Sequence, residues 1–324
     1  MSWMTSNNFL TPIQDGMLRV EALMHSQADS HHSDLAAALH QLLSSGGKRI
    51  RPAVALLTGE MLGGDPDRLV ILAAAIELLH TATLVHDDLI DGAFLRRGNA
   101  TLNSQWSPAA TVLTGDFIFA QAARLAAETN SVTVMHLFAD TLATIVNGEI
   151  TQLFSGHGLV DGEHYERRIY SKTASLFETA ARTAAMLSPV DDTVVEQMRG
   201  YGYAIGMAFQ IVDDILDFTG KQATVGKPTA SDLRQGLATL PTLYYWEACP
   251  EDPDLKTILE GNRIGEMEMN RLISAIRDSG SIHKALERAR GFIEHSLESL
   301  RDMPDNQERK ALENLARYIV DRRL

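Results

Sequence analysis

The chain has 324 residues and a mass of 35.6 kDa, with 45% hydrophobic and 22% charged residues. This composition is that of an ordinary globular protein, and it excludes disordered and fibrous classes. With 29 basic and 42 acidic residues the net charge is −13, so bulk electrostatics do not favour nucleic acid or anionic lipid as partners. Any anion site must be built locally, from a few clustered Lys and Arg side chains.

The single cysteine, Cys249, excludes an internal disulfide and fits a reducing cytosol. The longest apolar run, 69–79, contains Glu77 and is far shorter than the roughly 20 residues that span a bilayer. We therefore expect a cytoplasmic protein with no stable membrane insertion.

Apolar residues recur at helical spacing along most of the chain, for example over 69–90, 136–154 and 291–303. The acidic segment after Pro189 predicts another helix start. Convincing alternating strands are hard to find, and no shift in composition suggests a domain boundary. The pattern predicts one all-α domain over 1–324, with its helices packed around a central cavity.

An Asp-Asp-x-x-Asp pattern occurs twice, each time at the end of an apolar helical run. The aspartates are Asp87, Asp88 and Asp91 in the first motif and Asp213, Asp214 and Asp217 in the second. Residues four apart share a helix face, whereas the middle aspartate lies about 100° round the helix. Like charges at this spacing cost roughly 0.2–0.5 kcal/mol per pair, so we expect a cation to offset them. Oxygen-only ligands favour Mg²⁺, which usually shares its coordination shell with a phosphate.

Basic side chains gather in the segments around these motifs. They are Lys48, Arg49 and Arg51 in GGKRIRP, Arg96 and Arg97 after the first motif, Lys172 in SKTASLF, and Lys227 in GKPTASDLRQG. Arg offers paired donors to phosphate oxygens, and Lys offers a point charge. Singly, each could be a solvated charge or a salt-bridge partner, and His80 could be a hydrogen-bonded core histidine. Together with two metal-type carboxylate motifs, they indicate two phosphorylated substrates, one held by metal and one by Lys and Arg.

The order and spacing of eight blocks resemble the all-trans (E-type) isoprenyl diphosphate synthases, in the motif style of medium- and long-chain polyprenyl diphosphate synthases. The blocks are GGKRIRP (46–52), ELLHTATLVHDDLID (77–91), RRGNAT (96–101), LTGDF (113–117), NGEITQL (147–153), SKTASLF (171–177), GMAFQIVDDILDF (206–218) and GKPTASDLRQGLATLP (226–241). The resemblance implies an all-α bundle of about ten or more helices around a deep central cavity, usually as a homodimer. It also implies a prenyltransferase that condenses isopentenyl diphosphate with an allylic diphosphate, using three Mg²⁺ ions when substrate is bound.

The resemblance further implies roles for individual residues. The isopentenyl diphosphate site corresponds to Lys48, Arg51, His80 and Arg97. Contacts with the allylic diphosphate correspond to Arg96, Lys172, Thr173, Gln210 and Lys227. The magnesium ligands correspond to Asp87, Asp91 and Asp213, supported by Asp88, Asp214 and Asp217. Catalysis would then depend on Asp87, Asp91, Asp213, Lys172 and Lys227.

Product length is implied by the fourth and fifth positions before the first motif, Thr83 and Ala82. Short-chain members of the family place bulky aromatic residues there, which block chain growth. The two small residues therefore predict a product longer than farnesyl diphosphate, made from that primer or a similar one. A medium or long polyprenyl chain is the first expectation, and geranylgeranyl diphosphate is the alternative.

Three other functions compete with this interpretation. A class I terpene cyclase shares the fold and the first motif, but it binds no isopentenyl diphosphate and usually has a different second metal motif. A non-catalytic partner subunit usually loses aspartates, and all six are present here. A purely structural helical scaffold would not need either motif. GGKRIRP, Arg97 and the second motif favour the synthase.

Overall fold

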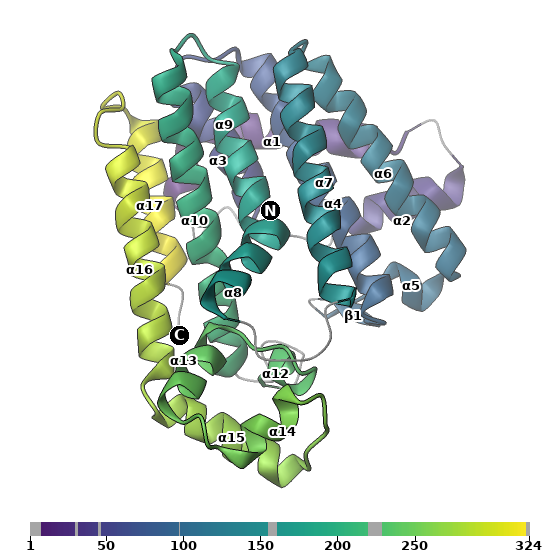
Figure 1. Ribbon diagram of the computed structural model, residues 1–324. Coiled ribbons are helices and arrows are strands. Elements are labelled where there is room, and N and C mark those ends of the chain that lie inside the picture. The colour runs from purple at the N-terminus through teal and green to yellow at the C-terminus, as the bar shows by residue number, and fades with distance from the viewer. Residues whose placement is uncertain are drawn as a thin grey trace. The chain divides into compact units, whose positions relative to one another are not determined.

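The computed structural model describes residues 8–29, 32–44, 47–96, 98–154, 161–219 and 229–321. These residues are almost entirely helical (Figure 1), so the predicted all-α class is confirmed. The strands that they contain form one short hairpin of β1, Leu95–Arg96, and β2, Asn99–Ala100. Leu95 pairs with Ala100 in antiparallel register, shortly after the first aspartate motif.

The chain divides into two compact units. Unit 1 comprises 1–142, 176–202 and 299–315, and unit 2 comprises 143–175, 203–298 and 316–324. The first aspartate motif therefore belongs to unit 1 and the second to unit 2. The expected single domain over 1–324 stays a prediction.

Unit 1 contains the N-terminal helices and the first aspartate motif. Its elements are the 3₁₀-helix η1 (Asn8–Ile13), α1 (Gln14–Ser26), α2 (Ser33–Ser44), α3 (Ile50–Met61), α4 (Pro66–Ile90), α5 (Leu102–Gln105), α6 (Pro108–Glu128), the first part of α7 (Val132–Phe154), nearly all of α9 (Ser175–Met186), the first part of α10 (Asp192–Thr219) and most of α17 (Gln307–Asp321). Helix α4 packs against α1, α3 and α6. Its Leu69, Leu72, Ile76 and Leu79 are at most 1% exposed, and their helical spacing makes them one core-facing stripe.

Local sequence sets both ends of α4. The Asp65 side chain accepts hydrogen bonds from the backbone N–H groups of Asp67 and Arg68, at 2.8 and 3.2 Å, with Pro66 in the first turn. Asp, followed by Pro at the first helical position, is a strong start signal. At the other end Gly92 has φ +60°, the left-handed conformation that ends many helices. The first aspartate motif therefore occupies the last turn of α4.

Helix α4 is long and apolar enough to cross a membrane by length and composition alone, but 72% of its most apolar segment is buried inside the protein. The buried helices of globular proteins can be equally long and apolar. The packing against three other helices identifies α4 as such a core helix.

Unit 2 contains the second aspartate motif. Its elements are the last part of α7, α8 (Gly162–Ile169), the π-helix η2 (Tyr170–Ala174), the last part of α10, α12 (Ser231–Arg234), α13 (Leu240–Ala248), α14 (Pro253–Leu259), α15 (Glu266–Asp278) and nearly all of α16 (Ser281–Ser299). Helix α10 begins after Pro189 as predicted, and the Asp191 side chain accepts a hydrogen bond from the Val194 N–H at 3.0 Å. In Figure 1, α13, α14 and α15 are grouped in green, and α15 packs against both α13 and α14.

The π-helix η2 approaches two other helices closely, through glycines on each. A Cβ atom added at Gly206 of α10 would lie 2.6 Å from the Cα of Ala174, and one at Gly148 of α7 would lie 2.6 Å from the Cβ of Ser171. Real Cβ atoms do not tolerate such distances, so both glycines are required for the contact. Because π-helices are rare and cluster at functional sites, η2 is a candidate functional element.

The close contact at Gly206 predicts that Gly→Ala substitutions at two helical positions will change the stability of the protein by different amounts. Gly206→Ala should lower stability by about 1–3 kcal/mol, because the added methyl group overpacks the contact with η2. Gly291→Ala is the matched control in α16, where an added Cβ would meet no atom within 4 Å, so it should be neutral or stabilising by up to about 1 kcal/mol. Urea unfolding of both variants measures this. Equal stabilities would contradict the packing argument.

Glu60 of α3 predicts a pH effect. Burial, together with the nearby negative charge of Glu308, raises the pKa of Glu60 to about 7 from its ordinary 4.5. The folded protein therefore holds the proton more tightly, and stability falls as the pH rises through that window. Glu60→Gln should raise the melting temperature at pH 8 and have little effect near pH 4. The exposed Glu294→Gln should lack this pH dependence, and the same profile for both variants would refute the mechanism.

Candidate functional site

The first aspartate motif has two accessible carboxylates and one buried carboxylate. Asp87 is half-buried and Asp91 exposed, whereas Asp88 is 7% exposed. The Asp88 carboxylate accepts a hydrogen bond from Nε of Arg96 at 2.8 Å. The backbone N–H of Asp91 donates to the Asp87 carbonyl at 2.8 Å, so the helical path continues to the last aspartate. The middle aspartate therefore holds Arg96 from the β1–β2 hairpin.

The second motif repeats this division. Asp213 and Asp217 are half-buried, and Asp214 is 3% exposed. Gln210 Nε2 donates to Oδ1 of Asp214 at 2.8 Å, and the Tyr165 hydroxyl donates to Oδ2 at 2.7 Å. Both Asp214 oxygens thus accept hydrogen bonds from side chains of unit 2.

Asp217 connects the second motif to α12. Its Oδ1 accepts a hydrogen bond from the Ser231 hydroxyl at 3.0 Å, and its Oδ2 accepts one from the Asp232 N–H at 3.2 Å. Its backbone carbonyl also accepts one from the Ala230 N–H at 2.8 Å. The segment that begins α12 is therefore tied to the last turn of α10.

Burial controls the electrostatics of the second motif. Desolvation raises the pKa of Asp214 to about 7, and the negative charge of Asp232 acts in the same direction, against the opposing hydrogen bonds. Burial and the Asp214 carboxylate also raise the pKa of Tyr165 well above its ordinary value. The Tyr165 hydroxyl therefore stays protonated and acts as the donor to Asp214.

The predicted allylic-diphosphate residues in unit 2 lie on η2 and α10. Lys172 is exposed, and its ammonium lies 2.8 Å from Oε1 of Glu149 on α7. Thr173 is 6% exposed, and its hydroxyl donates to Oε1 of Gln210 at 2.6 Å. The structure thus brings Thr173, Gln210 and the second aspartate motif together.

The predicted isopentenyl diphosphate residues in unit 1 come from two helices and the segment before them. Lys48 is exposed before α3, whereas Arg51 on α3 and His80 on α4 are half-buried. The Arg51 guanidinium lies 4.6 Å from the centre of the Phe177 ring, a cation–π distance. This contact orients Arg51 while leaving part of its side chain accessible.

Arg49 lies between these cations in the sequence but is turned into the core. Its Nη1 lies 2.9 Å from Oε1 of Glu77, and its Nη2 donates to the Leu43 carbonyl at 2.7 Å. Its backbone has φ +48°, the left-handed conformation that is uncommon for residues other than glycine. The basic segment is thus divided into one structural arginine and the partly accessible Lys48 and Arg51.

The two predicted chain-length residues differ in accessibility. Ala82 is 0% exposed, so its methyl group is fully packed against the protein. Thr83 is half-buried, and its hydroxyl donates to the His80 carbonyl at 2.7 Å. Thr83 is therefore the position at which a larger side chain can enter accessible space.

Two predicted site residues, Arg97 and Lys227, lie outside the described residues. Conversely, Tyr165 and Glu149 contact site residues although the sequence does not single them out. Glu149 stands inside the NGEITQL block, which marks it weakly. Tyr165 has no sequence signal of its own, because only the fold shows that it reaches Asp214.

The carboxylates fit Mg²⁺ by donor type. Asp87, Asp91 and Asp213 are each at least partly accessible, and Mg²⁺ typically uses one or two carboxylates together with phosphate oxygens. Within the described parts of the chain, no three carboxylate, imidazole or thiolate groups already form a metal cluster.

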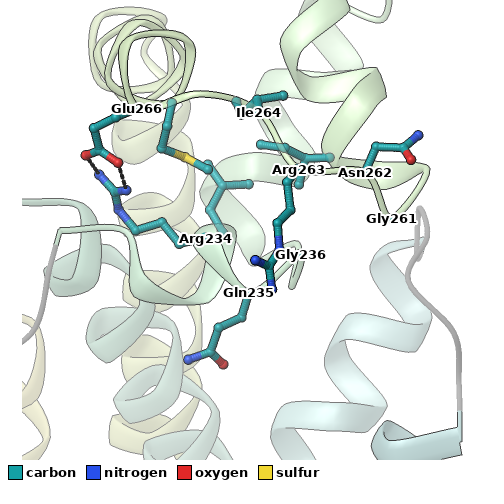
Figure 2. Close-up of a pocket in the computed structure, with 11 residues that line it drawn as sticks. Arg234, Gln235, Gly236, Gly261, Asn262, Arg263, Ile264 and Glu266 are labelled. Atoms are coloured by element: carbon teal, nitrogen blue, oxygen red, sulfur yellow. Dashed lines mark hydrogen bonds and ion pairs between the residues drawn. The ribbon is translucent and has the colours of Figure 1, made fainter.

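A separate pocket of about 510 Å³ lies in unit 2, between α12 and the loop that joins α14 to α15. Figure 2 shows Arg234 paired with Glu266, while Arg263 extends toward Gln235. None of the predicted site residues lines this pocket.

Comparison with known proteins identifies the family. The polyprenyl synthetase family profile matches residues 32–276. The octaprenyl diphosphate synthase of Escherichia coli is 35% identical, covering 94% of this chain and 95% of that protein. Heptaprenyl diphosphate synthase component 2 of Geobacillus stearothermophilus is 36% identical, covering 96% and 97%.

A solved structure agrees. The polyprenyl synthase of Caulobacter crescentus, crystallised with calcium and isoprenyl diphosphate, is 35% identical, with a TM-score of 0.91 over 98% of this chain and 97% of that one. The resemblance inferred from the motif blocks is thereby confirmed. The chain belongs to the polyprenyl synthetase family, and it is a prenyltransferase.

Proposed function

We propose that this prenyltransferase condenses isopentenyl diphosphate with farnesyl diphosphate or a similar allylic primer, giving an all-trans polyprenyl diphosphate longer than C15. The observation that carries the proposal is the pair of accessible carboxylates at each of two helix ends, accompanied by Lys48, Arg51 and Lys172. The octaprenyl and heptaprenyl products named for the relatives support a long chain. Geranylgeranyl diphosphate remains the alternative product, since a geranylgeranyl synthase is also a structural relative.

Mg²⁺ would be held by Asp87, Asp91 and Asp213, with Asp88, Asp214 and Asp217 in support and three ions when substrate is bound. Bound there, it supplies Lewis-acid stabilisation of the departing diphosphate. Lys172 and Arg96, joined by Lys227, hold the same diphosphate. Glu149 and Asp88 orient Lys172 and Arg96 through their ion pairs.

The two diphosphates need different treatment. The allylic C–O bond must ionise, and preorganised cations stabilise the charge that develops on the leaving group. The isopentenyl diphosphate must stay intact, so Lys48, Arg51, His80 and Arg97 hold it without metal. Its double bond attacks the allylic cation, and the released diphosphate takes the proton that is then lost.

We further propose a cytoplasmic homodimer. Helix α7 exposes Val146, Ile150, Leu153 and Phe154, whose spacing places them on one apolar face, as at subunit interfaces. The relative named as component 2 supports a different second subunit as the rival arrangement. Light scattering of the purified chain distinguishes a dimer from a lone monomer.

Catalysis should depend on the proposed metal ligands. Asp87→Ala and Asp213→Ala should each reduce turnover at least about a hundredfold, and EDTA should abolish it. The assay measures chain-extended product from farnesyl diphosphate, labelled isopentenyl diphosphate and Mg²⁺, with circular dichroism to verify folding. The exposed Asp302→Ala is the control. Near-normal turnover in a folded Asp87 or Asp213 variant would remove that residue from the metal site, and no product from any primer would reject the proposed reaction.

Product length should respond to Thr83 by sterics. Thr83→Phe should shorten the product, because the ring occupies space available to the growing chain, whereas the equally sized Thr83→Val should not. Ala82→Phe is a poorer test, since Ala82 is fully buried and a ring there would overpack the core. Chromatography of the extracted products gives their lengths. An unchanged distribution in active Thr83→Phe would show that the chain grows elsewhere.

A further inference from the structure

A chain of three hydrogen bonds runs through unit 2 beneath the second aspartate motif. The Tyr165 hydroxyl on α8 donates to Asp214 at 2.7 Å, and Gln210 donates to the other Asp214 oxygen at 2.8 Å. The Thr173 hydroxyl on η2 then donates to Gln210 at 2.6 Å. Every donor in this chain has an acceptor, so the direction of each bond is determined.

These three hydrogen bonds hold η2 against α10, and we call the four residues that form them the clamp. Gln210 and Asp214 lie one turn apart on α10, and they are bonded to Thr173 in η2 and to Tyr165 in α8, which precedes η2 without a break. The hydrogen bonds of Tyr165 and Thr173 to the same face of α10 fix the position of the whole α8–η2 segment along that helix. Lys172 lies between Tyr165 and Thr173 in the sequence, next to Thr173.

Burial makes the clamp rigid. Tyr165 is 0%, Asp214 3% and Thr173 6% exposed. The Arg168 guanidinium lies 5.5 Å from the centre of the Tyr165 ring. Removing one donor leaves a buried carboxylate under-satisfied, which costs more than the hydrogen bond itself. The local structure must then shift to recover a partner.

We propose that Tyr165 is a positioning residue for the allylic substrate: through Asp214 and Gln210 its hydroxyl fixes the π-turn that presents Lys172. Asp214 then supports the metal site by positioning and not as a ligand, since it is 3% exposed and each of its oxygens already accepts a hydrogen bond from inside unit 2. The inference rests on the proposed function of Lys172 at the allylic diphosphate. Small displacements of positioning groups can cost large factors in rate.

Tyr165→Phe tests the clamp by removing one oxygen atom. We expect kcat/KM for the allylic substrate to fall about tenfold, while KM for isopentenyl diphosphate changes less than about twofold. Tyr201→Phe is the matched control, because Tyr201 is also 0% exposed and donates its hydroxyl to a carbonyl, that of Leu312, at 2.9 Å. Similar melting temperatures with different allylic kinetics would separate positioning from stability. Equal kinetics in the two variants would overturn the proposal.

A double-mutant cycle tests the route. In an Asp214→Ala background, which has no side-chain acceptor, Tyr165→Phe should alter allylic kcat/KM less than about twofold, because the clamp is already broken. If the reductions in allylic kcat/KM from the two single substitutions multiply in the double variant, Tyr165 acts independently of Asp214. That result would overturn the proposal. Asp214→Ala alone should reproduce the loss, and it replaces Tyr165→Phe if that variant does not fold.

Two further measurements separate this inference from the proposed function. The first is the Mg²⁺ concentration that gives half of the maximal rate, which should rise in Asp213→Asn. In Asp214→Asn and Tyr165→Phe it should stay within about twofold of the original value. A rise in Asp214→Asn would make Asp214 a metal ligand and overturn its assignment as a positioning residue. Lys172→Ala reports on the site itself. If it lowers allylic kcat/KM and Tyr165→Phe does not, the positioning inference alone fails. If neither does, the proposed role of Lys172 fails first and the inference falls with it.

Discussion

Adjacent residues on a helix point about 100° apart, and this rotation decides the roles of the six aspartates. In each motif, the first and last carboxylates remain accessible, while the middle one enters the protein. A desolvated carboxylate is tolerated only where donors reach it. Arg96 supplies the donor to Asp88, and Tyr165 and Gln210 supply the donors to Asp214. Each motif therefore combines two accessible carboxylates with one buried carboxylate that anchors the neighbouring structure.

Because each buried aspartate needs hydrogen-bond donors, it also fixes the elements around its motif. Asp88 holds the hairpin that carries Arg96, and Asp214 holds α8 and η2, which carry Lys172. Gly206 and Gly148 allow η2 to approach α10 and α7 to a distance that no side chain permits. Backbone proximity and buried hydrogen bonds thus position the same five-residue π-turn.

The requirement that a buried charge has hydrogen-bonding partners also separates the buried basic residue from the accessible ones. Arg49 is buried where Glu77 and the Leu43 carbonyl accept hydrogen bonds from its two terminal nitrogens, and Arg forms such paired contacts well. Lys48 and Arg51 keep part of their side chains accessible to an anionic substrate. In a chain with a net charge of −13, such a local arrangement is what an anion site requires.

The sequence by itself determined the helical class, the two motifs, the basic blocks and the family, because helical periodicity and motif spacing are local properties of the chain. It also placed the ends of α4 and the start of α10, where Asp65, Gly92 and Asp191 act on their immediate neighbours. Only the tertiary structure decided that Asp214 is enclosed, that Arg49 faces inward and that Ala82 is fully packed. These outcomes depend on partners far along the chain, such as Tyr165 for Asp214, and no local pattern encodes which distant side chain will satisfy a buried charge.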